Sequence, residues 1–179
     1  MSTGQAILAA MTIRIRPTTL SDVTALPAIE RAAAGRFRDI PELAWLADGE
    51  VISAEQHLEY TERGLSWLAL ANGQPVGFIL AEAHPSSLFI VELSVDLDWQ
   101  GKGTGRQLIA CLADHARKKG LTSLTLTTFR DVPWNAPFYA RLGFERVTEL
   151  TPELRQKREE EAAHGLAYEA RCAMRLPLI

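Results

Sequence analysis

The sequence predicts an α+β protein built on one mixed, mostly antiparallel sheet of about seven strands, flanked by helices. Short alternating or apolar segments typical of strands recur along the 179 residues. Asn72-Gly73 separates two of them and is a strong hairpin signal, which pairs these strands antiparallel. An amphipathic helix joins the fourth strand to the fifth, and such a crossover makes that pair parallel.

Hydrophobic periodicity divides the first half of the chain into strands and helices. Ser21 or Asp22 is predicted to cap the first helix, and Ser53-Ala54-Glu55-Gln56 resembles the start of a second. The segment 37–49 is irregular because a proline and a glycine interrupt it. The expected elements are a strand at 13–16, helices at 23–33 and 53–63, and strands at 66–71, 76–83 and 88–95.

The second half continues with a helix from Gly103 to Lys119, which Gly120 ends. The segment from Thr151 to Gly165 is predicted to be a charged helix. Its Glu–Lys and Arg–Glu pairs, four residues apart, indicate a solvated face. The remaining expected elements are a strand at 121–129, a short helix around 138–139, and strands at 144–148 and 170–176.

Composition describes an ordinary globular chain and excludes several functions. The hydrophobic content is 47% and the charged content is 23%, which is ordinary for a globular protein. The net charge of −3 gives no reason to expect nucleic acid as a partner, and no membrane is expected because no apolar run approaches the ~18 residues of a membrane span. The length predicts one domain over residues 12–179, preceded by an extension at residues 1–11 that lacks the basic residues of a signal peptide. Cys111 and Cys172 form no motif, and Cys111 is expected to be a small buried hydrophobe. A cytoplasmic protein without a metal is expected, and homodimer formation stays open.

The run from Leu93 to Gly105 is the most informative stretch of the sequence. A strand ends near Val95, and the glycine-rich loop Gln100–Gly105 then opens directly into a helix. Glycine lets a ligand approach the backbone closely, and the helix start offers N–H groups and the positive end of the helix dipole. This arrangement suits a phosphate or pyrophosphate, with Lys102 and Arg106 as flanking cations.

The glycine spacing distinguishes this loop from other phosphate-binding motifs. It fits neither the dinucleotide fingerprint nor the P-loop, but it fits Gln-x-x-Gly-x-Gly at Gln100, Gly103 and Gly105. A second motif follows from Pro133 to Phe144, where a short helix carries Phe-Tyr and ends in Leu-Gly-Phe. Gly143 in this motif is predicted to supply a left-handed helix end.

With both motifs in this order, the chain resembles the GNAT N-acetyltransferases over about residues 13–178. The resemblance implies that the loop binds the pyrophosphate of the co-substrate acetyl-CoA, and that the fourth and fifth strands splay apart around the pantetheine arm. It also implies that the main chain of Leu93 and Val95 binds the acetyl carbonyl and the pantetheine amides. The coenzyme contacts so implied are Leu93, Ser94, Val95, Gln100, Gly101, Lys102, Gly103, Thr104, Gly105, Arg106 and Asn135.

Two residues are the candidates for proton transfer in such a reaction. Tyr139 is the candidate general acid, because the pKa of a phenol is about 10, close to that of the thiol it must protonate. Glu92 is the candidate base, since a carboxylate in an apolar strand needs a reason and burial would raise its pKa. The family's base often lies earlier in this strand, at the apolar residues 90–91 here, so Glu92 could equally bind the substrate amine or pair with an arginine. Glu82 and His84, on the preceding strand, are the alternative candidates for the base.

The position of Asn135 departs from the family pattern. Many members place the coenzyme-contacting asparagine seven residues before the tyrosine, at Val132 here, whereas Asn135 lies four residues before Tyr139. Asn135 is therefore expected mainly to cap its helix, and a coenzyme contact stays open.

The acceptor is expected to be a primary amine of a small molecule, acetylated by direct attack in a ternary complex. Aromatic residues gather where the family forms its acceptor cleft, namely Phe37, Trp45, Phe129 and Trp134, although Phe37 and Trp45 could instead be core. Arg38 and Arg130 could bind a substrate carboxylate. A protein amino group is the alternative acceptor, but the bulky segment 37–46 and the insertion 151–165 favour a covered pocket. A non-catalytic acyl-CoA-binding module is a further alternative, which Tyr139 and Glu92 argue against.

Overall fold

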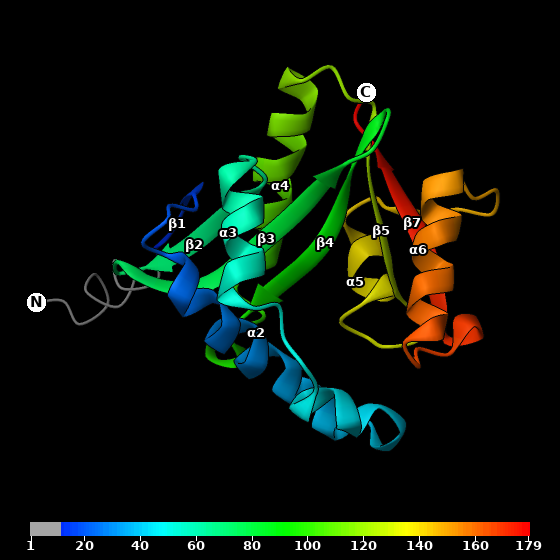
Figure 1. The fold of residues 1–179 in the computed structure, drawn as a ribbon, viewed down its shortest axis with the longest axis horizontal. Coiled ribbons are helices and arrows are strands. Elements are labelled where there is room, and N and C mark those ends of the chain that lie inside the picture. The colour runs from blue at the N-terminus through cyan, green and yellow to red at the C-terminus, as the bar shows by residue number, and fades with distance from the viewer. Residues whose placement is uncertain (1–11) are drawn as a thin grey trace, which may run out of the picture. The chain divides into compact units, whose positions relative to one another are not determined.

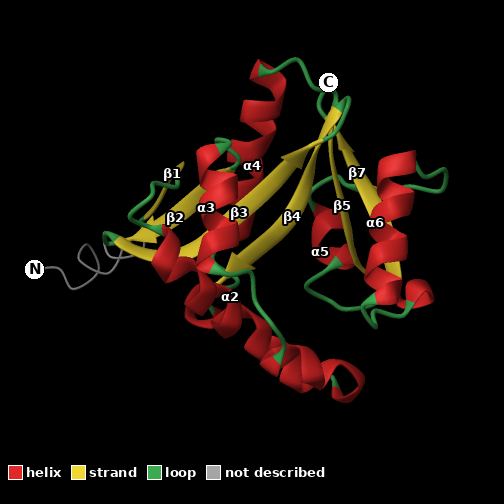
Figure 2. Ribbon diagram, in the orientation of Figure 1, coloured by secondary structure: helices red, strands yellow, loops and turns green. Residues whose placement is uncertain are grey.

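One mixed sheet with flanking helices organises the computed structural model, which describes residues 12–179 (Figures 1 and 2). The chain divides into two compact units. Of the described residues, the first contains 12–81 together with 92–112, and the second contains 82–91 and 113–179. One domain over residues 12–179 stays a prediction, and the extension expected at residues 1–11 lies outside the described residues.

Antiparallel pairing builds the sheet of the first unit. Its strands are β1 (Ile13–Pro17), β2 (Ser66–Ala71) and most of β3 (Gln74–Ala83). β1 pairs with β2, and β2 pairs with β3. In the turn between β2 and β3, Asn72 and Gly73 have φ values of 50° and 77°, which confirms the predicted hairpin because its tight turn needs positive φ at both positions.

Helical segments of the first unit begin later and differ in type from the prediction. Residues 23–25 form a short 3-10 turn, and the irregular segment 37–49 is 3-10 helical over most of its length. The Ser53 hydroxyl accepts a hydrogen bond from the N–H of Gln56, and the Gln56 side-chain oxygen accepts one from the N–H of Ser53, so this helix start is confirmed. The elements are η1 (Val23–Ala25), α2 (Leu26–Ala34), η2 (Gly35–Asp39), η3 (Pro41–Asp48) and α3 (Ala54–Glu62).

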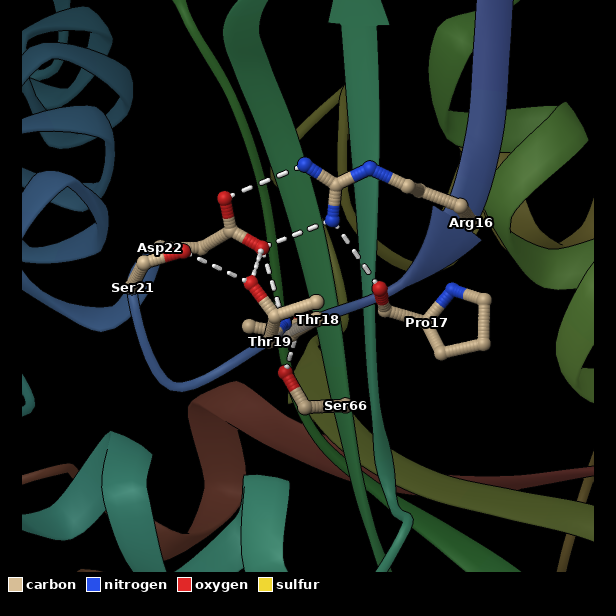
Figure 3. A network of polar contacts seen from close by, with 7 residues as sticks. All are labelled: Arg16, Pro17, Thr18, Thr19, Ser21, Asp22 and Ser66. Atoms are coloured by element: carbon tan, nitrogen blue, oxygen red, sulfur yellow. Dashed lines mark hydrogen bonds and ion pairs between the residues drawn. The ribbon is translucent and has the colours of Figure 1, made fainter.

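Asp22 joins the end of β1 to the turn that follows it (Figure 3). Its carboxylate accepts hydrogen bonds from the Arg16 guanidinium at 2.7 and 3.1 Å and from the Thr19 N–H and hydroxyl at 2.7 and 2.8 Å. The predicted cap by Ser21 or Asp22 is wrong, because these four bonds engage the carboxylate and no side chain caps the helix. The bonds from Arg16 hold the pKa of Asp22 well below its usual value.

The second unit contains the only parallel pair among the described residues. The start of β4 (Ser87–Val95) pairs with β5 (Ser123–Phe129), from Ser87 with Ser123 to Phe89 with Thr125. β5 then pairs antiparallel with β7 (Arg171–Pro177), and β7 pairs with β6 (Glu145–Arg146). The strand order is therefore β1-β2-β3-β4-β5-β7-β6. This order confirms the predicted mixed sheet, although β6 is only two residues long.

Three helices accompany these strands, namely α4 (Thr104–Lys118), α5 (Ala136–Arg141) and α6 (Pro152–Ala163). Cys111 on α4 is partly rather than fully buried, whereas Cys172 on β7 is buried. Within residues 12–179, no helix is long and apolar enough to cross a membrane.

The insertion helix α6 is solvated on one side only. Arg155 and Glu159 are exposed, as predicted. Leu154 is only 2% exposed and packs in a cluster with Phe89 and Ala173. Lys157, predicted to lie on the solvated face, instead binds Glu82, with 2.9 Å between Nζ and Oε1. The prediction was wrong here because the partner comes from β3, outside the helix.

His57 on α3 is fully buried, with its ring edge-on to Phe78 at a centroid distance of 4.8 Å. Neither ring nitrogen has a hydrogen-bond partner among the described residues. Burial lowers the pKa of His57 from 6.5 to about 4, because a charged imidazole is poorly solvated there.

His57 therefore predicts acid sensitivity of the fold. The unfolded chain binds this proton below pH 6.5 and the folded chain only near pH 4, so stability is complete above pH 6.5 and decreases as the pH falls. The loss reaches about 3 kcal/mol. We expect His57→Leu to remove this part of the pH dependence in urea unfolding, whereas the exposed control His164→Gln retains it. Equal slopes for wild type and His57→Leu between pH 4 and 6.5 would contradict the assignment.

Candidate functional site

The glycine-rich loop of the first unit connects η4 (Leu97–Trp99) to α4. Gly101 and Gly103 have φ values of 74° and 84°, a region that residues with a side chain rarely adopt. A Cβ at either position would meet no described protein atom within 4 Å. Backbone conformation rather than packing therefore requires these glycines, and the loop leaves its main chain accessible to a ligand.

The start of α4 is an anion-binding geometry. Its first helical hydrogen bond runs from the Gln107 N–H to the Gly103 carbonyl at 3.1 Å. The N–H groups of residues 104–106 have no carbonyl earlier in the helix to bind, and they carry the positive end of the helix dipole. Thr104 is only 1% exposed, whereas the next residue, Gly105, which consists of main chain alone, is partly exposed.

The two cations of the loop are available at its surface. Lys102 and Arg106 are both exposed. The Lys102 ammonium lies 4.8 Å from the ring centroid of Trp99, which orients it by a cation–π interaction. Positive charge, free helical N–H geometry and exposed glycines therefore occur together within seven residues, which suits a phosphate ligand.

Gln100, the first residue of the motif, acts through its side chain. Its Nε2 donates to the Val95 carbonyl at 2.8 Å, and its Oε1 accepts from Arg36 Nη1 at 3.2 Å. Arg36 lies 64 positions earlier in the chain. Nothing in the local sequence pattern indicated it, because a lone arginine at the end of a helix is ordinarily solvated.

The end of β4 presents one side of its main chain away from β3. The Asp96 N–H donates to the Val76 carbonyl on β3 at 2.8 Å. In an extended strand, the N–H and C=O of one residue point to the same side and those of its neighbour to the opposite side. The N–H of Val95 therefore points away from β3, together with the carbonyl that Gln100 binds. This orientation leaves Val95 suited to the predicted main-chain contact.

Gly77 on β3 allows this strand end to come close, and the sequence analysis missed it. A Cβ on Gly77 would lie 3.0 Å from the Ser94 carbonyl oxygen, 3.4 Å from Val95 Cγ2 and 3.5 Å from Leu108 Cδ1. A side chain there would push β3 away from β4 and α4. A glycine within a predicted strand is the signal that could have identified it, since such glycines often mark a close backbone approach.

Glu92, the candidate base, is partly buried near the end of β4. Its Oε1 accepts a hydrogen bond from the Ser94 hydroxyl at 3.0 Å, as two residues on one face of a strand can do. Ser94 is 3% exposed, so its side chain serves Glu92 rather than solvent. The base role of Glu92 stays a prediction.

The reserve candidates Glu82 and His84 form a different kind of cluster in the second unit. Glu82 Oε1 lies 2.9 Å from His84 Nε2, and its carboxylate also accepts from Lys157 at 3.0 Å. Burial alone would raise the pKa of Glu82, but the bonds from His84 and Lys157 outweigh it and hold the pKa below its usual value. A carboxylate with a lowered pKa is a poorer base. The cluster is better explained as a structural contact, in which Lys157 holds α6 to Glu82 at the end of β3.

Tyr139 lies in the middle of α5, in the second unit. Its ring packs edge-on against Phe138 and Phe144, with centroid distances of 5.1 and 5.4 Å. Gly143 follows the helix with a φ of 100°, which confirms the predicted left-handed helix end. The Phe-Tyr and Leu-Gly-Phe parts of the motif thus hold the tyrosine ring in place.

Asn135 occupies the position before α5, but its side chain makes no capping bond. Its Oδ1 instead accepts from the N–H of Phe129, at the end of β5, at 3.4 Å. The expected cap is therefore wrong, because the amide turns to a strand end that the local sequence does not include.

The four aromatic candidates differ in burial. In the first unit, Trp45 is 52% exposed and cannot be core, and Phe37 is partly buried. In the second unit, Phe129 is 5% exposed beneath the Arg171 guanidinium, 4.5 Å from the ring centroid, and Trp134 is partly buried. A cleft shared by all four stays a prediction.

The two arginines considered for a substrate carboxylate already have acidic partners. Arg38 Nη2 lies 2.8 Å from an Asp48 oxygen, and Arg130 Nη2 lies 3.0 Å from an Asp131 oxygen. Both pairs are exposed, so each arginine is held only weakly. The structure gives neither of them a distinct role.

Comparisons with known sequences agree with this geometry. A sequence profile of the acetyltransferase (GNAT) family matches residues 32–144. The L-2,4-diaminobutyric acid acetyltransferase of Nocardia farcinica is 30% identical over 93 residues, which cover 50% of this chain and 48% of that protein. The ribosomal protein bS18-alanine N-acetyltransferase of Escherichia coli is 29% identical over 87 residues, 49% of this chain and 59% of that one. The chain thus matches about half the length of these curated relatives.

Solved structures share the fold at lower identity. The PaiA N-acetyltransferase of Thermoplasma acidophilum, in complex with coenzyme A, has a TM-score of 0.69 at 18% identity, covering 93% of this chain and 99% of that one. The N-acetylglutamate synthase of Neisseria gonorrhoeae, complexed with coenzyme A and N-acetyl-glutamate, has a TM-score of 0.69 at 17% identity, covering 94% of this chain and 35% of that one.

The close contact at Gly77 predicts that even alanine, which adds a single methyl group, destabilises the fold at this position. Gly77→Ala should lower the free energy of unfolding by about 1–3 kcal/mol, because its Cβ would overpack the Ser94 carbonyl. Urea unfolding measures this, with Gly49→Ala as the matched control, since a Cβ there stays 3.4 Å from its nearest neighbour. Indistinguishable midpoints for the two variants would refute the packing role of Gly77.

Proposed function

This chain belongs to the acetyltransferase (GNAT) family, and we propose that it transfers the acetyl group of acetyl-CoA to a primary amine. The observation that carries the proposal is the loop at residues 100–105, where positive-φ glycines face open space at the start of α4. Coenzyme A is present in structures of proteins that share this fold. The loop main chain, Lys102 and Arg106 fit its pyrophosphate in charge and in geometry.

The end of β4 supplies the second part of the proposed coenzyme site. The Val95 N–H points away from β3, which supports the proposal that Leu93 and Val95 bind the acetyl carbonyl and the pantetheine amides through their main chain. A fixed backbone N–H stabilises the negative charge that develops on that oxygen during attack. Asn135 stays a proposed contact, although its side chain binds the Phe129 N–H.

The proposed chemistry needs two proton transfers. The neutral amine nitrogen attacks the thioester carbon, a C–N bond forms, and the C–S bond breaks to release a thiolate. Tyr139 gives the thiolate its proton, and Glu92 accepts the proton that the amine loses, through a water. The hydrogen bond from Ser94 fixes the Glu92 carboxylate.

We infer that the acceptor is a small molecule rather than a protein. The relatives are named for both kinds of acceptor. The observation that favours a small molecule is that side-chain contacts hold α6 in place within the second unit. Lys157 binds Glu82, and Glu161 binds Arg171 and Thr127. A helix held by partly buried charges at its middle and near its C-terminal end is fixed in place, whereas a protein substrate needs an open groove.

Coenzyme binding tests the loop assignment. Gly103→Val should abolish acetyl-CoA binding in calorimetry, because it removes the positive φ and fills the space the main chain leaves to the ligand. Gly105→Asp should do the same by placing an anion at the phosphate site. Gly120→Val is the matched control, since Gly120 also has positive φ and open surroundings, at the other end of α4. Unchanged affinity in folded Gly103→Val protein would reject the assignment.

The catalytic roles predict distinct kinetic changes. Tyr139→Phe should lower kcat by about 100-fold while leaving acetyl-CoA affinity nearly unchanged. Glu92→Gln should remove the acidic limb of the pH–rate profile if Glu92 is the base, and should raise KM for the amine with that limb intact if it only binds the acceptor. Tyr168→Phe, at an exposed tyrosine, is the control. Wild-type kcat for Tyr139→Phe, where chemistry limits the rate, would make this tyrosine structural.

A further inference from the structure

The η2 segment (Gly35–Asp39) contacts two neighbouring parts of the first unit, namely Leu97 on η4 and Gln100 of the loop at residues 100–105. At Gly35, a Cβ would lie 3.1 Å from Arg38 Nη1 and 3.2 Å from Leu97 Cδ1, so a larger residue there would press on these two side chains. One residue later, Arg36 Nη1 donates to Gln100 Oε1 at 3.2 Å. The segment that carries Phe37, a predicted acceptor residue, thus packs against η4 and is joined to the loop by a hydrogen bond.

The chemistry of these groups makes the contact directional. A guanidinium has only donors, so it can bind the oxygen of the Gln100 amide but not its nitrogen. With the oxygen held by Arg36, the nitrogen faces the Val95 carbonyl and donates to it at 2.8 Å. A flipped amide would place two oxygens against each other at Val95 and two donors against each other at Arg36. Arg36 therefore selects one of the two amide orientations.

The series of contacts from Arg36 through Gln100 ends at the peptide group between Val95 and Asp96, which is hydrogen-bonded on both sides. The Val95 carbonyl accepts from Gln100, and the N–H of the same peptide, on Asp96, donates to the Val76 carbonyl at 2.8 Å. With this peptide immobilised, the direction of the Val95 N–H is also restricted, because it lies on the same strand residue. Main-chain donors stabilise developing charge best when they need no reorganisation.

We propose that Arg36 is a positioning residue for acetyl transfer, which acts through the Gln100 amide to hold the Val95 main chain in line with the thioester carbonyl. This proposal rests on the proposed function. Arg36 touches neither substrate in it, and its effect is on the rate of the chemical step rather than on coenzyme affinity. The same contacts tie the acceptor segment to the loop, so loss of Arg36 also weakens binding of the amine.

A set of variants at two positions tests the relay. Arg36→Met should lower kcat by about 10-fold or more, with acetyl-CoA affinity within about twofold of wild type. Arg36→Lys should restore most of the rate, because an ammonium also has donors only. Gln100→Glu should be as damaging as Arg36→Met, because a carboxylate keeps the bond to Arg36 but cannot donate to Val95. The control is Arg31→Met, on an exposed side chain of α2.

A double-mutant cycle separates a relay from two independent contacts. Arg36→Met and Gln100→Met should each cost nearly as much kcat as the two together, because either one breaks the same chain. Additive losses would overturn the proposal, and so would wild-type kcat in Arg36→Met or failure of Arg36→Lys to restore the rate.

Side-chain NMR keeps this test apart from the test of the proposed function. The amide protons of Gln100 should give one well-dispersed pair in the wild type, which moves toward solvent-exposed values in Arg36→Met but not in Arg31→Met. This readout needs no turnover. If the wild type transfers no acetyl group, the proposed function fails while the NMR result still decides the orienting role. Unchanged Gln100 signals in Arg36→Met would overturn that role.

Discussion

The close approach of β3 to the end of β4 at Gly77 is the constraint on which the candidate coenzyme site depends. Because Gly77 has no side chain, the Ser94 carbonyl and the Val95 side chain can pack where a Cβ would stand. This approach lets the Asp96 N–H donate a hydrogen bond to the Val76 carbonyl. After the turn at η4, the Gln100 side chain donates to the Val95 carbonyl. Packing, a backbone bond and a side-chain bond thus hold one short piece of main chain. Such a piece is suited to bind a carbonyl oxygen without first reorganising.

Charge is used differently in the two units. In the first, the exposed cations Lys102 and Arg106 stand beside helical N–H groups that lack partners within the helix, which leaves positive potential available to an anion. In the second, partly buried carboxylates are already satisfied: Glu82 by His84 and Lys157, and Glu161 by Arg171. The first arrangement suits an anionic ligand. The second fixes α6 against the sheet and lowers the pKa of Glu82, which makes that carboxylate less basic.

Sequence reasoning succeeded where a residue's own backbone decides the structure. Asn72 and Gly73 turn the hairpin, Gly103 opens the loop and Gly143 ends α5, each with the positive φ that its type allows. Reasoning from the sequence failed for polar side chains that were predicted to cap a helix nearby but that bind another partner in the structure. Asp22 binds Arg16 rather than capping a helix, and Asn135 binds the end of β5 rather than its own helix start.

By itself, the sequence determined the order of the elements, the mixed sheet, and the strand, glycine loop and helix that form the proposed coenzyme site, because each depends on spacings within a few residues. Only the tertiary structure decided that Arg36 orients Gln100, that Gly77 admits the end of β4, and that Lys157 is fastened to Glu82. Those contacts join positions far apart in the chain. Their energies depend on distance and burial, which come into existence only when the sheet has folded.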